Sequence, residues 1–149
     1  MMETKYPDYD NCLINVSNSI LHYYNLPTYH STLPELDKLL NKQYKNVVLL
    51  LYDGLGSLLL NDKLPHSFLM QNKLKDITSV FPATTTAATT SIISGLSPME
   101  HCWLGWDIYV AAIEKTVTMY RNVEKNTGFP IMTDDLCKKN FLLSQSLRE

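Results

Sequence analysis

One uninterrupted apolar run constrains the fold of this chain more than any other feature. The run covers 46–52 and is bounded by Lys45 on one side and by Asp53 and Gly54 on the other. It lacks the alternation of apolar and polar residues that is typical of a strand with one face exposed to solvent. A continuous run of this kind is typical of a strand in a parallel sheet that helices cover on both faces. We therefore predict a buried strand at 46–52.

A second strand is predicted at 76–81, after a stretch with helical spacing. The helical patterns lie around 57–61 and 64–73 and are separated at Pro65. A strand, a helical crossover and another strand form a βαβ unit, in which both strands run in the same direction. The predicted fold class is therefore α/β, with a mostly parallel sheet flanked by helices.

Helical spacing also marks the N-terminal part of the chain. Apolar residues recur every three or four positions over 9–24, and a shorter pattern follows over 33–40, where Thr32 is the expected cap. We interpret 1–45 as an N-terminal helical segment and 46–149 as the N-terminal part of an α/β domain.

Further elements are expected after the second strand. A helix is predicted over 87–94 and ends at Gly95, because glycine readily adopts the left-handed backbone of a helix end. Weaker patterns predict strands at 106–110 and 116–120, and a helix over 133–139.

Charge and cysteine content narrow the classes of partner. The 149 residues include 13 basic and 15 acidic side chains, so the net charge does not favour binding to nucleic acid or to an anionic membrane. The apolar runs fall well short of the roughly 20 residues of a membrane helix, and the N-terminus lacks the pattern of a secretory signal. Three cysteines without a paired motif are typical of reduced thiols. We expect a cytoplasmic protein.

Asp53 stands where the first predicted strand ends, and open α/β sheets bind their ligands at such ends. Two interpretations fit this residue. Its carboxylate is suited to a divalent metal ion, and an Asp followed by Gly54 is equally suited to a tight turn.

The three consecutive threonines Thr84, Thr85 and Thr86 lie between the second predicted strand and the next helix. Free N–H groups and the helix dipole make a helix start suitable for phosphate. A threonine hydroxyl becomes a useful nucleophile when a metal ion binds it as the alkoxide. The alternative is that Thr84 only caps the helix. If the two strands are adjacent, Asp53 and Thr85 lie near each other and form half of a two-metal phosphoryl-transfer site.

Three segments in this order and spacing resemble the alkaline-phosphatase superfamily, most closely its type I phosphodiesterase and nucleotide pyrophosphatase family. They are 46–54, which resembles the strand carrying a metal-binding Asp, 81–91, which resembles the nucleophile segment, and 94–101, which resembles the loop that follows. The resemblance covers about 46–130. It therefore concerns the N-terminal part of such an enzyme.

The resemblance implies a hydrolase of phosphodiester or pyrophosphate bonds that acts on a small phosphoester or nucleotide. It implies Thr85 as the nucleophile, with Thr84 and Thr86 open if the register shifts by one residue. Asp53 and Thr85 would bind metal, and the enzyme would use two divalent ions, Zn²⁺ by family preference. We also expect Thr86 to bind the substrate phosphate at the helix start. Trp106 either stacks on a nucleobase or packs in the core.

The sequence departs from the family pattern at several points. Cys102 follows His101 where the family has glycine, and Ala88 stands where related enzymes place a phosphate-binding Asn. We expect a structural role for His101. Beyond Tyr120 the sequence lacks the Asp and His pattern that completes the two metal sites, so we expect this chain to be inactive alone and to need a missing C-terminal half. A phosphomutase or phosphatase branch is an alternative, whereas the segment typical of sulfatases is absent.

Overall fold

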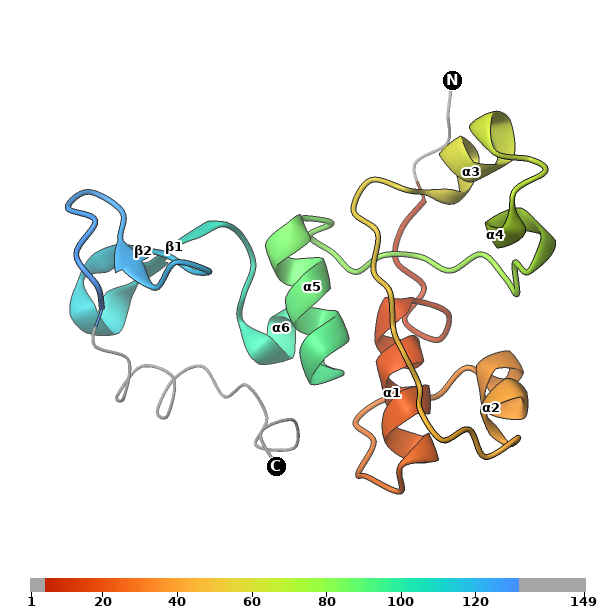
Figure 1. Cartoon of the computed structure of the whole chain (residues 1–149). Helices are drawn as coiled ribbons and strands as arrows, with labels where there is room; N and C mark the ends of the chain where they lie inside the picture. The colour runs from red at the N-terminus through yellow and green to blue at the C-terminus, as the bar shows by residue number, and fades with distance from the viewer. Residues whose placement is uncertain (1–4, 132–149) are drawn as a thin grey trace.

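The computed structural model describes residues 5–131, without the side chain of Ala112. This part of the chain is a mixed α/β structure with six helices and a small antiparallel sheet of three strands (Figure 1). The α-helices are α1 (Leu13–Tyr23), α2 (Pro34–Leu40), α3 (Ser57–Lys63), α4 (Phe68–Gln71), α5 (Thr85–Ser94) and α6 (Pro98–His101). The sheet contains β1 (Asp107–Val110), β2 (Lys115–Thr118) and β3 (Val123–Glu124), and a short 3₁₀ helix, η1 (Ala111–Ile113), joins β1 to β2.

Helices α1 and α5 pack against each other at the centre of the molecule (Figure 1). Their shared apolar core consists of four buried residues from three parts of the chain: Cys12, Ile14, Val80 and Ala87. Residues on both sides of the expected boundary at 45/46 thus belong to one core, and the N-terminal helices are not packed as a separate unit.

Asn18, in the middle of α1, is completely buried and uses its whole amide group. Its Nδ2 donates to the carbonyl oxygens of Ile14 (2.8 Å) and Gly95 (2.9 Å). Its Oδ1 accepts from the N–H groups of Tyr29 (2.8 Å) and His30 (3.1 Å). This one side chain therefore joins α1 to the end of α5 and to the loop that precedes α2.

Asn15, one turn earlier on α1, makes a second set of buried contacts. Its Oδ1 accepts from the N–H of Cys12 (2.7 Å), which caps the helix start. Its Nδ2 donates to the carbonyl oxygens of Tyr9 (3.0 Å) and Ser31 (2.8 Å). Together the two asparagines fix the segments on either side of α1 to its buried face.

Gly95 ends α5 with a left-handed backbone, φ +72°, as the sequence predicts. A side-chain carbon at this position would lie 3.2 Å from Leu21 Cδ1 and 3.5 Å from Asn18 Nδ2. Glycine therefore meets two requirements here, the backbone conformation and the close approach of α5 to α1.

The β-hairpin forms a second small core on the other side of α5 (Figure 1). Strands β1 and β2 pair in antiparallel register, with Ile108 opposite Val117. Val110, Val117 and Met119 are buried, and Trp103 packs against them. The two predicted strands at 106–110 and 116–120 are thus confirmed as a hairpin.

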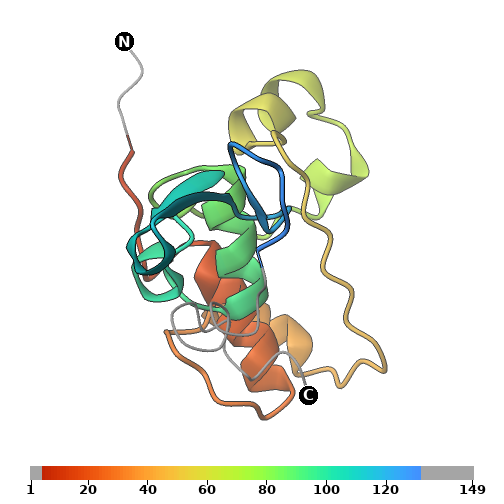
Figure 2. The ribbon, with the colours of Figure 1, turned by 90° about the vertical axis from the view of Figure 1, so that its left-hand side faces the viewer.

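The two strands predicted at 46–52 and 76–81 do not form a parallel sheet within residues 5–131. The segment 46–52 is extended but pairs with no strand there, and it runs along the outside of the molecule from α2 to α3 (Figure 2). In the second segment only Thr78 forms a bridge, in parallel with Cys12. The apolar run encodes a preference for strand geometry, but a strand also needs a neighbouring strand, which this part of the chain does not provide.

The helices predicted within residues 5–131 are confirmed, with shifts of a few residues at their ends. Helix α5 begins at Thr85 instead of 87, and Leu33 takes the cap position of α2 that was expected for Thr32. The hydroxyl of Thr32 donates instead to Asp37 Oδ2 (2.6 Å). The helix predicted at 133–139 lies outside the described residues. Of the helices in 5–131, none has the length and apolar character to cross a bilayer.

We predict that Asn18→Leu lowers the free energy of unfolding by about 3 kcal/mol, because it leaves buried N–H and C=O groups without partners. Urea denaturation followed by circular dichroism measures this change. The matched control is Asn61→Leu, at an exposed position of α3, which should change stability by less than about 0.5 kcal/mol. An equal loss in the free energy of unfolding in both variants would contradict the role of the Asn18 hydrogen bonds.

Candidate active site

Asp53 and Thr85 line the same cleft, which has a volume of about 830 Å³. One wall is the turn that follows 46–52, another is the segment before α5, and the first turns of α5 close it. The two residues singled out from the sequence are thus brought together, although no paired strand ends position them. The remaining lining residues are Leu13, Leu51, Tyr52, Gly54, Leu55, Gly56, Ile77, Thr78, Ser79, Ala88 and Thr89.

Asp53 lies in a turn and is exposed. Gly54 follows it with φ +73°, a conformation that favours glycine. The Asp-Gly turn that the sequence suggested is therefore present. Because the turn leaves the carboxylate open to the cleft, the turn and a role in binding are compatible at this residue.

The three threonines at the start of α5 have different environments. Thr84 is the cap, and its Oγ1 accepts from the N–H of Ala87 (3.3 Å). Thr86 is 1% exposed, and its Oγ1 has no hydrogen-bond partner among the described residues. Thr85 is exposed and is the one of the three that lines the cleft. The geometry therefore favours Thr85 over its neighbours as a group that meets a ligand.

The first N–H groups of α5 are a second feature of the cleft. The N–H of Ala87 is occupied by the Thr84 cap, whereas those of Thr85 and Thr86 donate to no atom in the described part of the chain. Unpaired N–H groups at a helix start attract anions. An anion at this position would therefore meet the N–H of Thr85, and the buried side chain of Thr86 would not line its site.

The donor atoms of the cleft fit a metal site only in part. Asp53 is the single carboxylate in the lining, and the other side-chain oxygens are hydroxyls. Within residues 5–131, no group of three His, Cys, Asp or Glu side chains could hold an ion. Two divalent ions need more ligands than these. The side chains of residues 5–131 that line this cleft are too few for such a site.

Trp106 does not line the cleft. It lies at the start of the hairpin, is half exposed, and contacts Tyr120 edge to face with ring centres 5.7 Å apart. Trp103 contacts the same ring at 6.0 Å. The packing interpretation of Trp106 therefore fits this arrangement better than stacking on a substrate in the cleft.

His101 holds α6 against α5 from a buried position. Its Nδ1 accepts from the N–H of Trp103 (3.0 Å), so the ring proton lies on Nε2, which donates to Ser91 Oγ (2.9 Å). Burial lowers the pKa of His101 below its ordinary value. This neutral, buried pair of Ser and His has the structural role expected of His101 and is closed to substrate.

Cys102 adopts the left-handed conformation, φ +61°. This is the position at which the resemblance led us to expect glycine. A residue other than glycine is strained in this conformation, because its β-carbon lies too close to the following carbonyl oxygen.

Comparison of the chain with known protein families, with curated proteins and with solved structures finds no match.

We predict that the protein loses stability as pH falls below about 6.5, because the unfolded histidine binds a proton near that pH and the folded His101 binds one only at lower pH. The stabilisation is complete above this range and declines within it. His101→Gln, which cannot titrate, should flatten the profile between pH 7 and pH 5 in urea denaturation. His66→Gln, at an exposed histidine, should keep the slope. An unchanged slope in His101→Gln would contradict the assignment.

We also predict that Cys102→Gly stabilises the fold by about 0.5–1 kcal/mol. Relief of the left-handed strain gains roughly 1–2 kcal/mol, and the greater freedom of glycine in the unfolded chain offsets part of it. Thermal unfolding measures the effect. Cys102→Ala keeps the β-carbon and removes the thiol, so it should bring no such gain. If alanine stabilises as much as glycine, backbone strain is not the cause.

Proposed function

We propose that this chain is the N-terminal part of a metal-dependent hydrolase of phosphodiester or pyrophosphate bonds, in the phosphodiesterase and nucleotide pyrophosphatase branch of the alkaline-phosphatase superfamily. The observation that supports this most directly is the shared cleft of Asp53 and Thr85 at the start of α5. A carboxylate, an accessible hydroxyl and free helix N–H groups are suited to one chemistry, the transfer of a phosphoryl group.

In this proposal Thr85 Oγ1 attacks phosphorus and forms a phosphothreonine, while the ester or anhydride oxygen leaves with its bonding electrons. The proton of Thr85 passes to water. The N–H of Thr85 stabilises the negative charge of the phosphoryl oxygens, because it lies at the start of α5 and donates to no atom in the described part of the chain. Water then releases the phosphate and regenerates the hydroxyl. The substrate is a small phosphoester or nucleotide.

Asp53 and Thr85 are the residues of this chain that would hold a metal ion. Such an ion, with Zn²⁺ as the family preference and a second ion beside it, would supply charge stabilisation to the reacting phosphoryl group. The remaining ligands would come from a C-terminal half. We propose that the C-terminal half also supplies the other strands of a mostly parallel sheet, in which 46–52 becomes a central strand.

The partial donor set favours a second proposal for the chain alone, that it is a catalytically incomplete piece.

A phosphatase or phosphomutase would use the same nucleophile, and a panel of monoesters, diesters and mutase substrates would distinguish these branches. We place the protein in the cytoplasm because the two cysteines among residues 5–131, Cys12 and Cys102, are free thiols.

The test of the nucleophile uses the polypeptide encoded by the whole open reading frame, with zinc and bis(4-nitrophenyl) phosphate. Thr85→Ala should lower kcat by about a thousandfold or more, and Thr85→Ser should retain part of the activity. Thr89→Ala is the matched control, because Thr89 lines the same cleft and has no role in the reaction. Absent turnover in the parent polypeptide, or unchanged turnover in Thr85→Ala, would contradict the proposal.

The test of the incomplete site uses the 149-residue chain and isothermal titration with Zn²⁺. We expect binding weaker than micromolar, reduced further in Asp53→Asn and unchanged in Asp62→Asn, because one carboxylate with hydroxyl groups makes a poor zinc site. Sub-micromolar binding that depends on Asp53 would show that the chain holds a complete metal site.

A further inference from the structure

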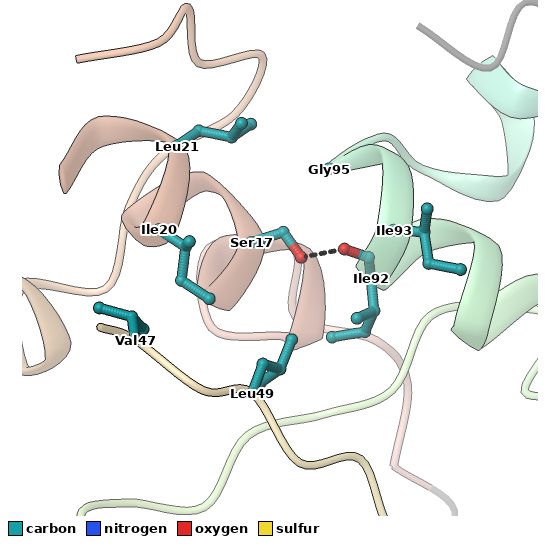
Figure 3. A pocket seen from close by; sticks show the side chains of 8 residues that line it. All are labelled: Ser17, Ile20, Leu21, Val47, Leu49, Ile92, Ile93 and Gly95. Atoms are coloured by element: carbon teal, nitrogen blue, oxygen red, sulfur yellow. Dashed lines mark hydrogen bonds between the residues drawn. The ribbon is translucent and has the colours of Figure 1, made fainter. Parts of the chain in front are cut away.

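The extended segment 46–52 lacks a strand's neighbours, and much of its apolar surface is open to water. Val48 and Leu50 are 77% and 67% exposed, and Leu51 and Tyr52, which border the Asp53 cleft, are 53% and 57% exposed. Val47 and Leu49 point the other way, into a hollow of about 370 Å³ against α1 and α5 (Figure 3). Ser17 lies at the base of this hollow and donates to the carbonyl of Ile92 (2.6 Å). The segment is therefore seated on the helices through Val47 and Leu49, while Val48 and Leu50 are open to solvent.

An open strand of this composition is a template for pairing with another strand. Its N–H and C=O groups pair with no strand in the described part of the chain. The segment contains no proline, glycine or charged residue, which are the usual means of blocking such an edge. Association through this segment would satisfy the backbone groups along one of its edges and remove apolar surface from water.

The charges at its two ends indicate what pairs with it. Lys45 and Asp53 flank the segment, and both are exposed. In an extended chain they are roughly 26 Å apart, so they cannot pair with each other. Neither forms an ion pair with any other described residue.

We propose that this segment pairs with the same segment of a second copy of the chain, in antiparallel orientation about a two-fold axis at Leu49. In that register Lys45 lies opposite the partner's Asp53 and Asp53 opposite the partner's Lys45, so two ion pairs close the ends of the ladder. A parallel pairing in register would place like charges opposite each other, which is unfavourable. The sequence 45–53 is thus complementary to itself in one orientation only.

Sedimentation equilibrium of the 149-residue chain tests this proposal. The chain should form a dimer, and Lys45→Asp or Asp53→Lys alone should raise the dissociation constant about tenfold, since each replaces two attractive pairs by two repulsive ones. The double variant Lys45→Asp with Asp53→Lys restores both pairs and should dimerise within about twofold of the parent. The matched control is Lys42→Asp with Asp62→Lys, at exposed positions outside the segment, which should have no effect.

A monomer at all concentrations overturns the proposal. So does dimerisation that the single reversals leave unchanged, or a double variant as weak as the single ones. Open-ended aggregation that ignores the charge changes also overturns it. The test of dimerisation is separate from the test of the phosphoester hydrolase, because the double variant removes the Asp53 carboxylate and is still expected to dimerise.

Cysteine cross-linking tests the orientation separately, in a background with Cys102→Ser and Cys137→Ser. Position 48 lies opposite position 50 only in the antiparallel register, at a spacing that a disulfide can span. A mixture of Val48→Cys and Leu50→Cys chains should therefore cross-link faster than either variant alone. Faster cross-linking of Val48→Cys with itself would overturn the antiparallel arrangement.

Discussion

The buried amide of Asn18 is the interaction on which the arrangement of this chain most depends. It satisfies backbone groups from α1, from the end of α5 and from the loop at 29–30 at the same time. No apolar side chain could do so, because these groups would remain unpaired away from water. The position of α5 follows from this contact together with the close approach at Gly95. Since α5 presents Thr85 to the cleft, the geometry of the candidate site depends on the contact between Asn18 and Gly95 at the opposite end of that helix.

The helices could be predicted from the sequence because their signals are local. The left-handed Gly95, the proline at the start of α2 and the apolar spacing of α1 each act within a few residues. The partner of a strand is not encoded within the strand, so 46–52 shows its extended geometry without a sheet. The roles of Asn18 and Ser91 were missed for the same reason. A buried polar side chain is recognised only when its distant partners are known.

The sequence and the structure place Asp53 and Thr85 on one cleft by different routes. Asp53 and Thr85 do meet in one cleft, but a turn and a helix start position them, and no adjacent strand ends do. Which of the three threonines faces the cleft depends on which of them caps the helix. The sequence alone does not decide this, because each neighbouring hydroxyl could serve as the cap. In the structure Thr84 has that role. Cys102 stands where the resemblance led us to expect glycine, and its left-handed backbone is seen only in the structure.

The two proposals for this chain meet at Asp53. In the dimer its carboxylate faces the partner's Lys45, whereas in the hydrolase it faces a metal ion in the cleft. A carboxylate that already pairs with the partner's lysine gains less free energy from binding a metal ion, and the reverse also holds. Dimerisation and metal binding therefore weaken each other by linkage. A strand at 46–52 covered by the remainder of a parallel sheet would also have no free edge for a second copy. Self-association is therefore a property of the chain with an open edge, and completing the sheet would release Asp53 to bind metal.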